Sequence, residues 1–543
     1  MNRGTAPWWE TAVIYQVYPR SFLDSDGDGI GDLRGVRSRL PYLRALGIDA
    51  VWISPFYPSP QADGGYDVAD YCAVDPSFGT LAEFDQLVAE AHALGLRLLI
   101  DLVPNHTSSA HPWFRAALAA PPNAPERRWY HFRGANPRHP DAPPNDWPSV
   151  FGGSAWSRTP DGDWYLHLFD AEQPDLNWEH PPVRDAFDEA LRFWLDRGVD
   201  GFRIDVAHGM VKAAGLPDVG LSRAALQSGS LPTHAAPYFD QEGVHDIARR
   251  WRAVLDEAPG DRMMVAEAWV QPPDRLARYL RPGEYHQAFN FTLLESRWTA
   301  PALRASIVET LRSHAAVGAV PSWVWGNHDV VRPATRLAWA HRDPSPQLAT
   351  RTPEPNVELG QRRARAAMAL LLSLPGAAYL YQGEELGLPE VLDLPPEARR
   401  DPTFSRTGGA ELGRDGCRVP LPWRHDAPAF GFSPSGASWL PQPPEFAALA
   451  VDRQAGVAGS TLELTRELLA LRRARALGVG ELRWEGEDPE RLAFTRHTVA
   501  GVTRVVVNLG VDDWPIPAGA TILVATAPIA SGRLAPESAV WLA

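Results

Sequence analysis

Three acidic residues follow separate apolar segments of the chain, and their types suit the chemistry of glycoside cleavage. They are Asp205, Glu267 and Asp329, found in GFRIDV, MMVAEAW and PSWVWGNHD. Such chemistry needs one ionised carboxylate at the anomeric carbon and one protonated carboxyl that releases the leaving oxygen. Arg203 lies two residues before Asp205, so in a strand both point to one face and the guanidinium favours an ionised nucleophile. The apolar surroundings of Glu267 favour its protonated form.

The elements that must position these acids are short apolar segments alternating with helical patterns. Eight segments are typical of strands: 12–19, 50–55, 96–104, 201–206, 263–269, 286–294, 321–329 and 377–385. Helical periodicity covers 33–47, 80–95, 182–198, 245–258, 301–317, 358–374 and 461–475. Apolar strands without strict alternation indicate a parallel sheet covered on both faces, and eight strands in a βα series predict an α/β fold, the TIM (β/α)8 barrel. A doubly wound sheet fits less well, because no glycine-rich phosphate loop follows the first strand.

Polar residues close four of the expected strands, where a TIM barrel has its active site. The third strand ends in DLVPNH, which contains Asp101, Asn105 and His106. A single aspartate at a strand end is usually a helix cap or an ion-pair partner, and a single loop histidine is usually a satisfied surface group. Four such strand ends in barrel order predict instead that these side chains converge on one rim.

Two segments interrupt the alternation, and a third follows it. Residues 107–180 are rich in Pro, Asn, Asp, Trp and Gly, which predicts an inserted domain B after the third strand. Residues 388–459 form a second, Pro-rich insertion of irregular structure, so the barrel is expected to comprise 1–106 and 181–479. The tail, 480–543, contains LAFTRHT, RVVVNLG and TILVATA, which predict a small antiparallel β domain.

The composition narrows the class of protein. With 66 acidic and 52 basic residues, the net charge of −14 argues against a nucleic-acid partner. No apolar run reaches the ~18–20 residues of a membrane span, and the first residues lack the pattern of a secretory signal. Cys72 and Cys417 are the only cysteines, so no disulfide framework is expected, although one bond between them stays possible. A cytoplasmic location follows as the expectation. The 21 Trp suit either sugar stacking or a large core.

The motifs DLVPNH (101–106), GFRIDV (201–206), VAEAW (265–269) and NHD (327–329) resemble the four signature regions of the α-amylase family of glycoside hydrolases. The resemblance covers essentially the whole chain, including domain B and the C-terminal β domain. It implies Asp205 as nucleophile, Glu267 as general acid/base and Asp329 as stabiliser of the transition state. It also implies that a glucose unit is held in the first subsite by His106, Arg203 and His328.

Within that family the chain is most similar to oligo-1,6-glucosidase and related exo-acting α-glucosidases. QPDLN (173–177), DGGYD (63–67), YQGEELG (381–387) and GRDGCRVPLPW (413–423) carry this likeness, with Gly416 where Asn is more usual. The resemblance implies that Tyr66 stacks on the terminal glucose, while Asp63 and Arg414 bind its outer hydroxyls and close the pocket. Phe151 and Phe169 match positions in its aromatic wall. The implied activity is retaining hydrolysis of short α-linked oligosaccharides through a glucosyl-enzyme, with transglycosylation at high substrate.

The acidic loop at 24–32 matches part of a Ca²⁺-binding loop. Asp24, Asp26, Asp28, Ile30 and Asp32 lie at its positions 1, 3, 5, 7 and 9. Position 12 is a glycine and no helix precedes the loop, which excludes an EF-hand. The resemblance implies a structural Ca²⁺, or Mg²⁺, bound by these residues; the alternative is a solvated acidic turn.

The linkage and two other functions stay open at this point. Val206, directly after the expected nucleophile, matches the residue associated with α-1,6 preference, but Ala-His-Gly after it departs from that pattern, so α-1,4 and α-1,6 are both possible. A sucrose isomerase or trehalose synthase shares the same three acids. The other alternative is a non-catalytic partner like the amylase-like subunits of amino-acid transporters. Such a protein is anchored in a membrane and does not need the three acids.

Overall fold

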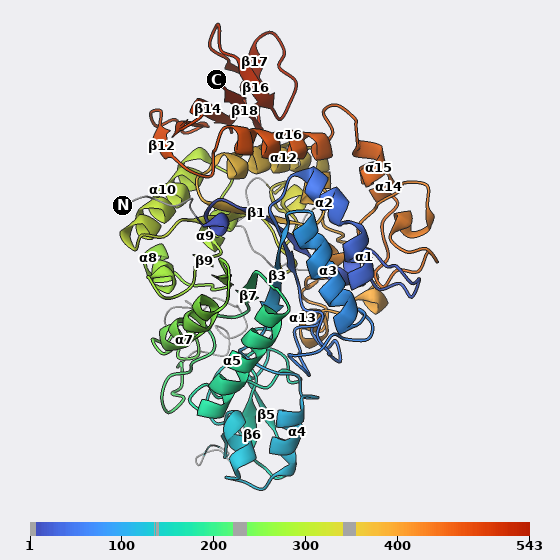
Figure 1. Ribbon diagram of the computed structural model, residues 1–543, viewed down its shortest axis with the longest axis vertical. Helices are drawn as coiled ribbons and strands as arrows, with labels where there is room; N and C mark the ends of the chain where they lie inside the picture. Colours follow the sequence, from blue (N-terminus) through green and yellow to red (C-terminus); the bar gives the residue numbers. More distant parts are fainter. Residues whose placement is uncertain (1–6, 135, 137–140, 221–235, 340–353) are drawn as a thin grey trace.

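The computed structural model describes residues 7–134, 136, 141–220, 236–339 and 354–543, and its centre is a parallel β-barrel (Figure 1). The sheet has the order β10-β11-β1-β2-β3-β7-β8-β9, and a parallel bridge between Phe289 and Ser322 joins its two edges. Its strands are β1 (Val13–Val17), β2 (Ala50–Ile53), β3 (Arg97–Leu102), β7 (Gly201–Ile204), β8 (Met263–Ala266), β9 (Gln287–Ala288), β10 (Ser322–Val324) and β11 (Ala377–Tyr381). The predicted TIM barrel is confirmed.

Helices follow the strands and cover the barrel. The longer ones are α3 (Leu81–Ala93), α5 (Pro181–Asp196), α7 (Val244–Glu257), α10 (Ala300–Ala316), α12 (Val357–Ser373) and α16 (Thr461–Ala474). The shorter ones are α1 (Leu33–Ser38), α2 (Leu40–Leu46), α8 (Pro273–Leu276), α9 (Phe291–Leu294) and α11 (Pro333–Arg336). Among the described residues, no helix is both long enough and apolar enough to cross a membrane.

Two predicted elements are wrong in detail. The helix expected over 33–47 divides into α1 and α2, because Pro41 lacks an N–H and its ring crowds the carbonyl four residues earlier. The strand expected over 286–294 is only two residues long. Asn290 then accepts the backbone N–H of Leu293 and caps α9, which buries apolar side chains that a strand would equally have buried.

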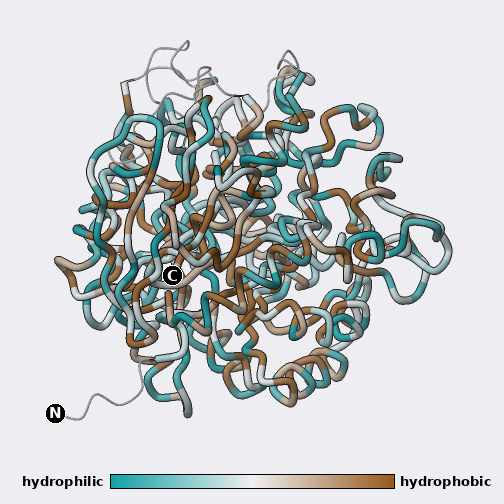
Figure 2. The backbone as a smooth tube through the Cα atoms, turned by 90° about the horizontal axis from the view of Figure 1, so that it is seen from above, coloured by the Kyte–Doolittle hydropathy of each residue, from teal (hydrophilic) through white to brown (hydrophobic). Residues whose placement is uncertain are grey.

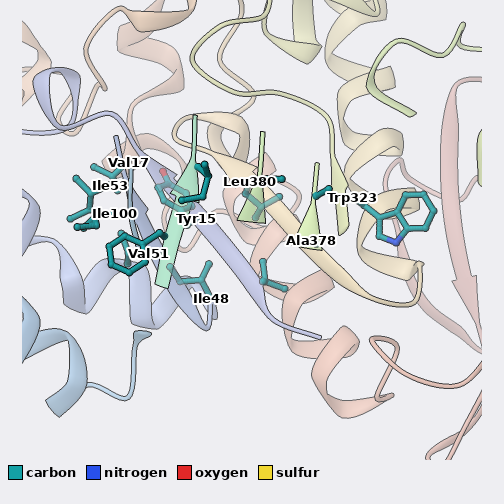
Figure 3. Packing of buried hydrophobic residues seen from close by; sticks show 14 of the residues in the cluster. Tyr15, Val17, Ile48, Val51, Ile53, Ile100, Trp323, Ala378 and Leu380 are labelled. Carbon is teal, nitrogen blue, oxygen red and sulfur yellow. The ribbon is translucent and has the colours of Figure 1, made fainter. Parts of the chain in front are cut away.

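Alternating side chains of the strands divide the core into two layers. Tyr15, Val51 and Ile100 face outward and pack with helix residues in one large cluster, part of which Figure 3 shows. Ile14 and Leu99, one residue along, belong to a separate cluster inside the barrel. Both layers are buried, which explains why the sequence of each strand is a continuous apolar run. In Figure 2 the hydrophobic stretches gather toward the middle of the molecule.

The segment after β3 carries a small sheet of its own, β4-β6-β5, formed by β4 (Phe132–Arg133), β5 (Trp156–Arg158) and β6 (Trp164–Leu166). With α4 (Pro112–Ala119) it lies at the end of the molecule opposite the C-terminal sheet in Figure 1. Residues 388–459 contain only short helices: α13 (Pro402–Arg406), α14 (Phe446–Leu449), α15 (Val451–Gln454) and 3-10 turns, of which η8 (Asp415–Arg418) matters below.

The tail forms an antiparallel sheet in the order β12-β13-β14-β18-β16. Its strands are β12 (Glu481–Trp484), β13 (Arg491–Thr498), β14 (Gly501–Asn508), β16 (Ile522–Ala525) and β18 (Ser538–Leu542), beside the short pair β15 (Trp514–Pro515) and β17 (Arg533–Leu534). The sheet packs on α12 and α16 (Figure 1). Cys72 and Cys417 are both free thiols, so the disulfide left open above does not form.

Candidate active site

One guanidinium joins the carboxylates at the ends of three neighbouring strands. Arg203 of β7 lies in register with Asp101 of β3. Its Nη1 donates to Asp101 Oδ1 at 2.7 Å and to Asp205 Oδ1 at 2.5 Å, and its Nη2 lies 3.8 Å from Glu267 Oε2. Arg203 is 1% exposed. The period of the strand therefore puts Arg203 and Asp205 on one face, as expected, and the barrel brings Glu267 to the same cation.

Val206 orients the second carboxyl through its backbone. Its N–H donates to Glu267 Oε2 at 2.8 Å. Its φ is 45°, in the left-handed region that a β-branched residue rarely adopts. This strained turn, held by the buried residues around it, directs the N–H of Val206 toward Glu267 and not along the strand.

Burial sets the protonation of this pair. It raises the pKa of Asp205 and of Glu267, and although Arg203 opposes the rise, repulsion between the two carboxylates adds to it for Asp205. The two carboxyls titrate as a pair, so the first proton that the pair binds can reside on either acid. We assign that proton to Glu267, because Arg203 contacts Asp205 directly but lies 3.8 Å from Glu267. Asp205 is then ionised as a nucleophile requires, and Glu267 can act as an acid.

The third acid, Asp329, is held by two arginines. Arg414 Nη1 and Arg418 Nη2 donate to its Oδ1 at 3.1 and 2.9 Å. Burial raises the pKa of Asp329, but the neighbouring cations outweigh burial and keep it below its usual range. A protonated His328 would lower the pKa of Asp329 most strongly. Burial, however, lowers the pKa of His328 well below 6.5 and leaves its ring neutral, so we attribute the effect to the arginines. Sequence analysis did not single out Arg418, because only the fold shows that a residue four positions after Arg414 reaches the same carboxylate.

Arg414 also connects the wall of the pocket. Its Nη2 donates to Asp63 Oδ1 at 2.5 Å, its Nε binds Asp401, and its guanidinium lies 4.9 Å from the centre of the Phe151 ring. Burial raises the pKa of Asp63 to about 6 despite Arg414 and Arg418. Gln173, in the QPDLN segment, donates to Asp63 Oδ2 at 3.1 Å and so ties domain B to this wall.

Tyr66 contacts both histidines, His328 by stacking and His106 through its backbone carbonyl. The Tyr66 ring lies parallel to that of His328, 5.0 Å away at 10°, and its hydroxyl donates to Asp101 Oδ2 at 3.0 Å. His106 Nε2 lies 3.1 Å from the carbonyl oxygen of Tyr66, and burial lowers the pKa of His106 to about 4. One face of Tyr66 is thus covered by His328, and these three side chains are neutral at physiological pH.

The only lysine of the chain lies beside this site. Lys212 is the single lysine among 543 residues, and all other strongly basic side chains of the sequence are arginines. Its Nζ donates to Asp175 Oδ2 at 2.6 Å, to Asn105 Oδ1 at 2.9 Å and to the Gly209 carbonyl. Burial lowers its pKa, and the Asp175 carboxylate opposes the fall. Lys212 thus fastens the loop after Asp205 to the end of β3 and to domain B, a role that its sequence position did not reveal.

These side chains surround a cavity of about 1040 Å³. The predicted residues that line it are Asp63, Tyr66, His106, Phe151, Phe169, Asp205, Glu267, Asp329 and Arg414. Arg203 and His328 lie behind this lining and are fully buried, so in this structure they support the groups at the surface of the cavity. Trp269, His208 and Tyr238 line the cavity as well and were not predicted.

The acidic loop is separate from the cavity. Carboxylate oxygens of Asp24, Asp26 and Asp28 lie within 4.8 Å of one another. Asp24 accepts the backbone N–H of Gly27 and Gly29 at 2.7 and 2.8 Å. Asp32 accepts the N–H of Gly35 and caps α1, and it does not belong to the close group that the other three acids form.

A (β/α)8 barrel with a cavity at the carboxyl ends of its strands, lined by two paired carboxyls and a third acid, is the arrangement of a glycoside hydrolase. The α-amylase catalytic domain matches residues 16–480, and the chain belongs to the α-amylase family.

Individual members of similar sequence or structure match this chain over most of its length. A probable α-glucosidase of Rhizobium meliloti is 40% identical over 90% of this chain and 87% of its own length. Trehalose-6-phosphate hydrolase of Escherichia coli is 35% identical over 94% of this chain and 92% of its own. Among solved structures, the α-glucosyl transfer enzyme XgtA superposes with a TM-score of 0.85 at 39% identity, covering 99% of both chains. Isomaltulose synthase of Klebsiella sp. LX3 gives 0.84 at 30% identity over 99% of this chain and 100% of its own.

Proposed function

We propose that this glycoside hydrolase is a retaining, exo-acting α-glucosidase that removes terminal glucose from short, uncharged α-linked oligosaccharides. The observation that carries the proposal is the single buried guanidinium of Arg203 shared by Asp205 and Glu267. Glu267 protonates the glycosidic oxygen while Asp205 attacks the anomeric carbon, which forms a β-glucosyl-enzyme. Glu267, now ionised, takes a proton from water as the water releases α-glucose. Asp329 binds sugar hydroxyls as positive charge develops on the ring.

The wall formed by Asp63 and Arg414 supports exo attack. Arg414 bridges Asp63 to Asp329 and Asp401, so this side of the cavity is closed by ion pairs. A chain that continued beyond the terminal sugar would have to displace them. Carboxylates and a guanidinium at such a wall suit the outer hydroxyls of one terminal glucose.

The charge of the cavity supports a neutral substrate over a phosphorylated one. Its described lining includes the acids Asp63, Asp146, Asp205, Glu267, Glu295, Asp329 and Glu411. Only Arg406 and Arg414 among those lining residues are permanently cationic, and both are engaged. Arg406 binds Asp170 at 3.2 Å and the Gly152 carbonyl at 2.7 Å. A phosphate group would therefore be repelled by the acids and would find no free cation to bind. The site thus suits a neutral sugar better than trehalose 6-phosphate, the substrate in the name of its relative trehalose-6-phosphate hydrolase.

The second candidate is transfer or isomerisation, supported by the likeness to XgtA and to isomaltulose synthase. The same glucosyl-enzyme is attacked in that case by a sugar hydroxyl, and a cavity of about 1040 Å³ has room for an acceptor beside the glucose. Val206 lines the cavity next to Asp205, where it would contact the leaving sugar in the proposed reaction. Both α-1,4 and α-1,6 linkages stay within the proposal.

We also propose a structural cation, Ca²⁺ or Mg²⁺, at the acidic loop. The oxygens of Asp24, Asp26 and Asp28 suit a hard cation. Burial and the repulsion of neighbouring acids raise the pKa of Asp28, which an ion would relieve. The cation would brace the turn before α1 and take no part in catalysis.

The test is glucose release from maltose, isomaltose, sucrose, trehalose and trehalose 6-phosphate, measured beside Asp205→Ala. Hydrolysis of one or more neutral disaccharides, none of the phosphate ester, and loss of activity by several orders of magnitude in the variant are expected. Rearranged disaccharide in place of free glucose would favour the isomerase, and cleavage of trehalose 6-phosphate alone would overturn the argument from charge.

A further inference from the structure

Position 416 has no room for a side chain. Gly416 lies in η8, between Arg414 and Arg418. A Cβ there would overlap Glu390 Oε1 and lie 2.5 Å from the carbonyl oxygen of Val391. The glycine that departs from the Asn of the motif is therefore required by this structure, because the backbone oxygen of Val391 cannot move aside and the Glu390 carboxylate occupies the remaining space.

Glu390 is fastened on its other side to the segment that carries Asp329. Its Oε2 accepts the backbone N–H of Arg332 at 2.9 Å. Arg332 follows Asp329 by three residues, and its Nη2 donates to the Cys417 carbonyl at 2.7 Å, which belongs to η8. Glu390 is 7% exposed, so water does not substitute for these contacts.

The position of the Asp329 carboxylate depends on two segments, the one that runs from Asp329 to Arg332 and η8. Its backbone belongs to the first, and the two arginines that bind its Oδ1 flank Gly416 in the second. A shift between the segments would move Asp329 relative to Arg414 and Arg418. We propose that Glu390, which takes no part in the reaction itself, is a positioning residue for Asp329: it locks the Asp329 segment against η8, and Gly416 provides the space for it.

Glu390 holds the two segments together in two ways: one carboxylate oxygen accepts the Arg332 N–H, and the other fills the space beside Gly416. Burial raises the pKa of Glu390 to about 7, against the opposing effect of Arg332 and Arg399, while Asp415 and the Cys417 thiol are the other titratable groups nearby. Either protonation state still offers an oxygen to the Arg332 N–H. Glutamine should therefore replace Glu390, whereas alanine removes both the acceptor and the contact with η8.

The experiment measures kcat and KM of Glu390→Ala and Glu390→Gln with whichever α-glucoside the wild type hydrolyses, and so rests on the proposed function. Glu390→Ala should lower kcat about tenfold to a hundredfold with little change in KM, as small displacements of transition-state groups do. Glu390→Gln should stay close to wild type. In the background of Asp329→Asn, Glu390→Ala should cost almost nothing more, because its effect passes through Asp329.

The matched control is Glu284→Ala. Glu284 is as buried as Glu390 and pairs with His245 at 2.6 Å and Arg249 at 2.8 Å, but does not line the cavity. It should lower thermal stability and leave kcat unchanged. An unchanged kcat in Glu390→Ala, or a loss that adds fully to that of Asp329→Asn, would overturn the proposal. If the alanine variant does not fold, Glu390→Asp, which withdraws the carboxylate by one methylene, must lower kcat for the proposal to stand. If the wild type hydrolyses nothing, the proposed function is refuted, but the positioning role of Glu390 is not. That role is then judged by glucose binding, measured in Glu390→Ala beside Asp329→Asn.

Discussion

The unique lysine gives a prediction whose size follows from its contacts. Lys212→Met removes the cation from Asp175, whose carboxylate then keeps, among the described residues, the Asn105 amide at 3.1 Å and the Leu168 N–H at 2.8 Å. A buried carboxylate that loses its ion-pair partner costs about 3–5 kcal/mol. An unfolding entropy of about 2.1 cal/mol/K per residue gives roughly 1.1 kcal/mol/K for 543 residues that unfold together. The expected fall in Tm is therefore about 3–5 °C.

Differential scanning calorimetry of Lys212→Met, Lys212→Arg and Arg312→Met measures this effect. Lys212→Arg should also unfold earlier, because a planar guanidinium does not fit among three acceptors that surround a compact ammonium. Arg312 pairs with Asp274 at the surface, so its loss should leave Tm unchanged. Amine-reactive reagents should modify Lys212 only after unfolding, since its side chain is 1% exposed. A Tm of Lys212→Met equal to wild type, or rapid labelling of the native protein, would refute the reasoning.

Three further predictions concern protons. Burial raises the pKa of Asp63 to about 6, so its ion pair with Arg414 weakens as the pH falls through this value; kcat/KM should fall with it, and Asp63→Asn should lose that limb of the profile. Burial raises the pKa of Glu384 to about 8 from 4.5, so the native state holds a proton that the unfolded chain releases between these values. Stability should therefore fall as pH rises through that window, and less steeply in Glu384→Gln; parallel Tm curves would contradict this. Glu267→Ala should lose hydrolysis of disaccharides but keep the first, fluoride-releasing step on α-glucosyl fluoride, whose leaving group needs no proton. A burst of fluoride should then precede slow turnover, because the second step still lacks its base, and absence of that burst would argue against an acid role.

The barrel was predictable from the sequence because its signal is local. Each strand is an apolar run bounded by turns, and the polar residue that closes it, such as Asp205 or Glu267, is adjacent in the chain. The short β9 was not predictable to that accuracy, since Phe291 and Leu294 are buried equally well in a strand or in a helix capped by Asn290. Pattern alone does not distinguish the two.

Side chains that act across long separations were the ones missed. Arg418 reaches Asp329 over 89 positions, and Lys212 reaches Asn105 over 107. Gly416 reads as a simple departure from a motif until the fold brings Glu390 against it. The motifs therefore identified many residues of the cavity lining, although not Trp269, His208 or Tyr238. They did not identify Arg418 or Lys212, which hold residues of the site in place.

The central claim is that Asp205 forms a covalent bond to glucose. The most direct measurement is mass spectrometry of the protein after incubation with 5-fluoro-α-glucosyl fluoride. Its ring fluorine slows both formation and breakdown of a glucosyl-enzyme, and its activated leaving group restores formation, so the intermediate accumulates. The account predicts one added fluoroglucosyl group, located by peptide sequencing on Asp205 within GFRIDV and absent from Asp205→Ala. A label on another residue, or β-glucose as the first product with no label, would contradict it.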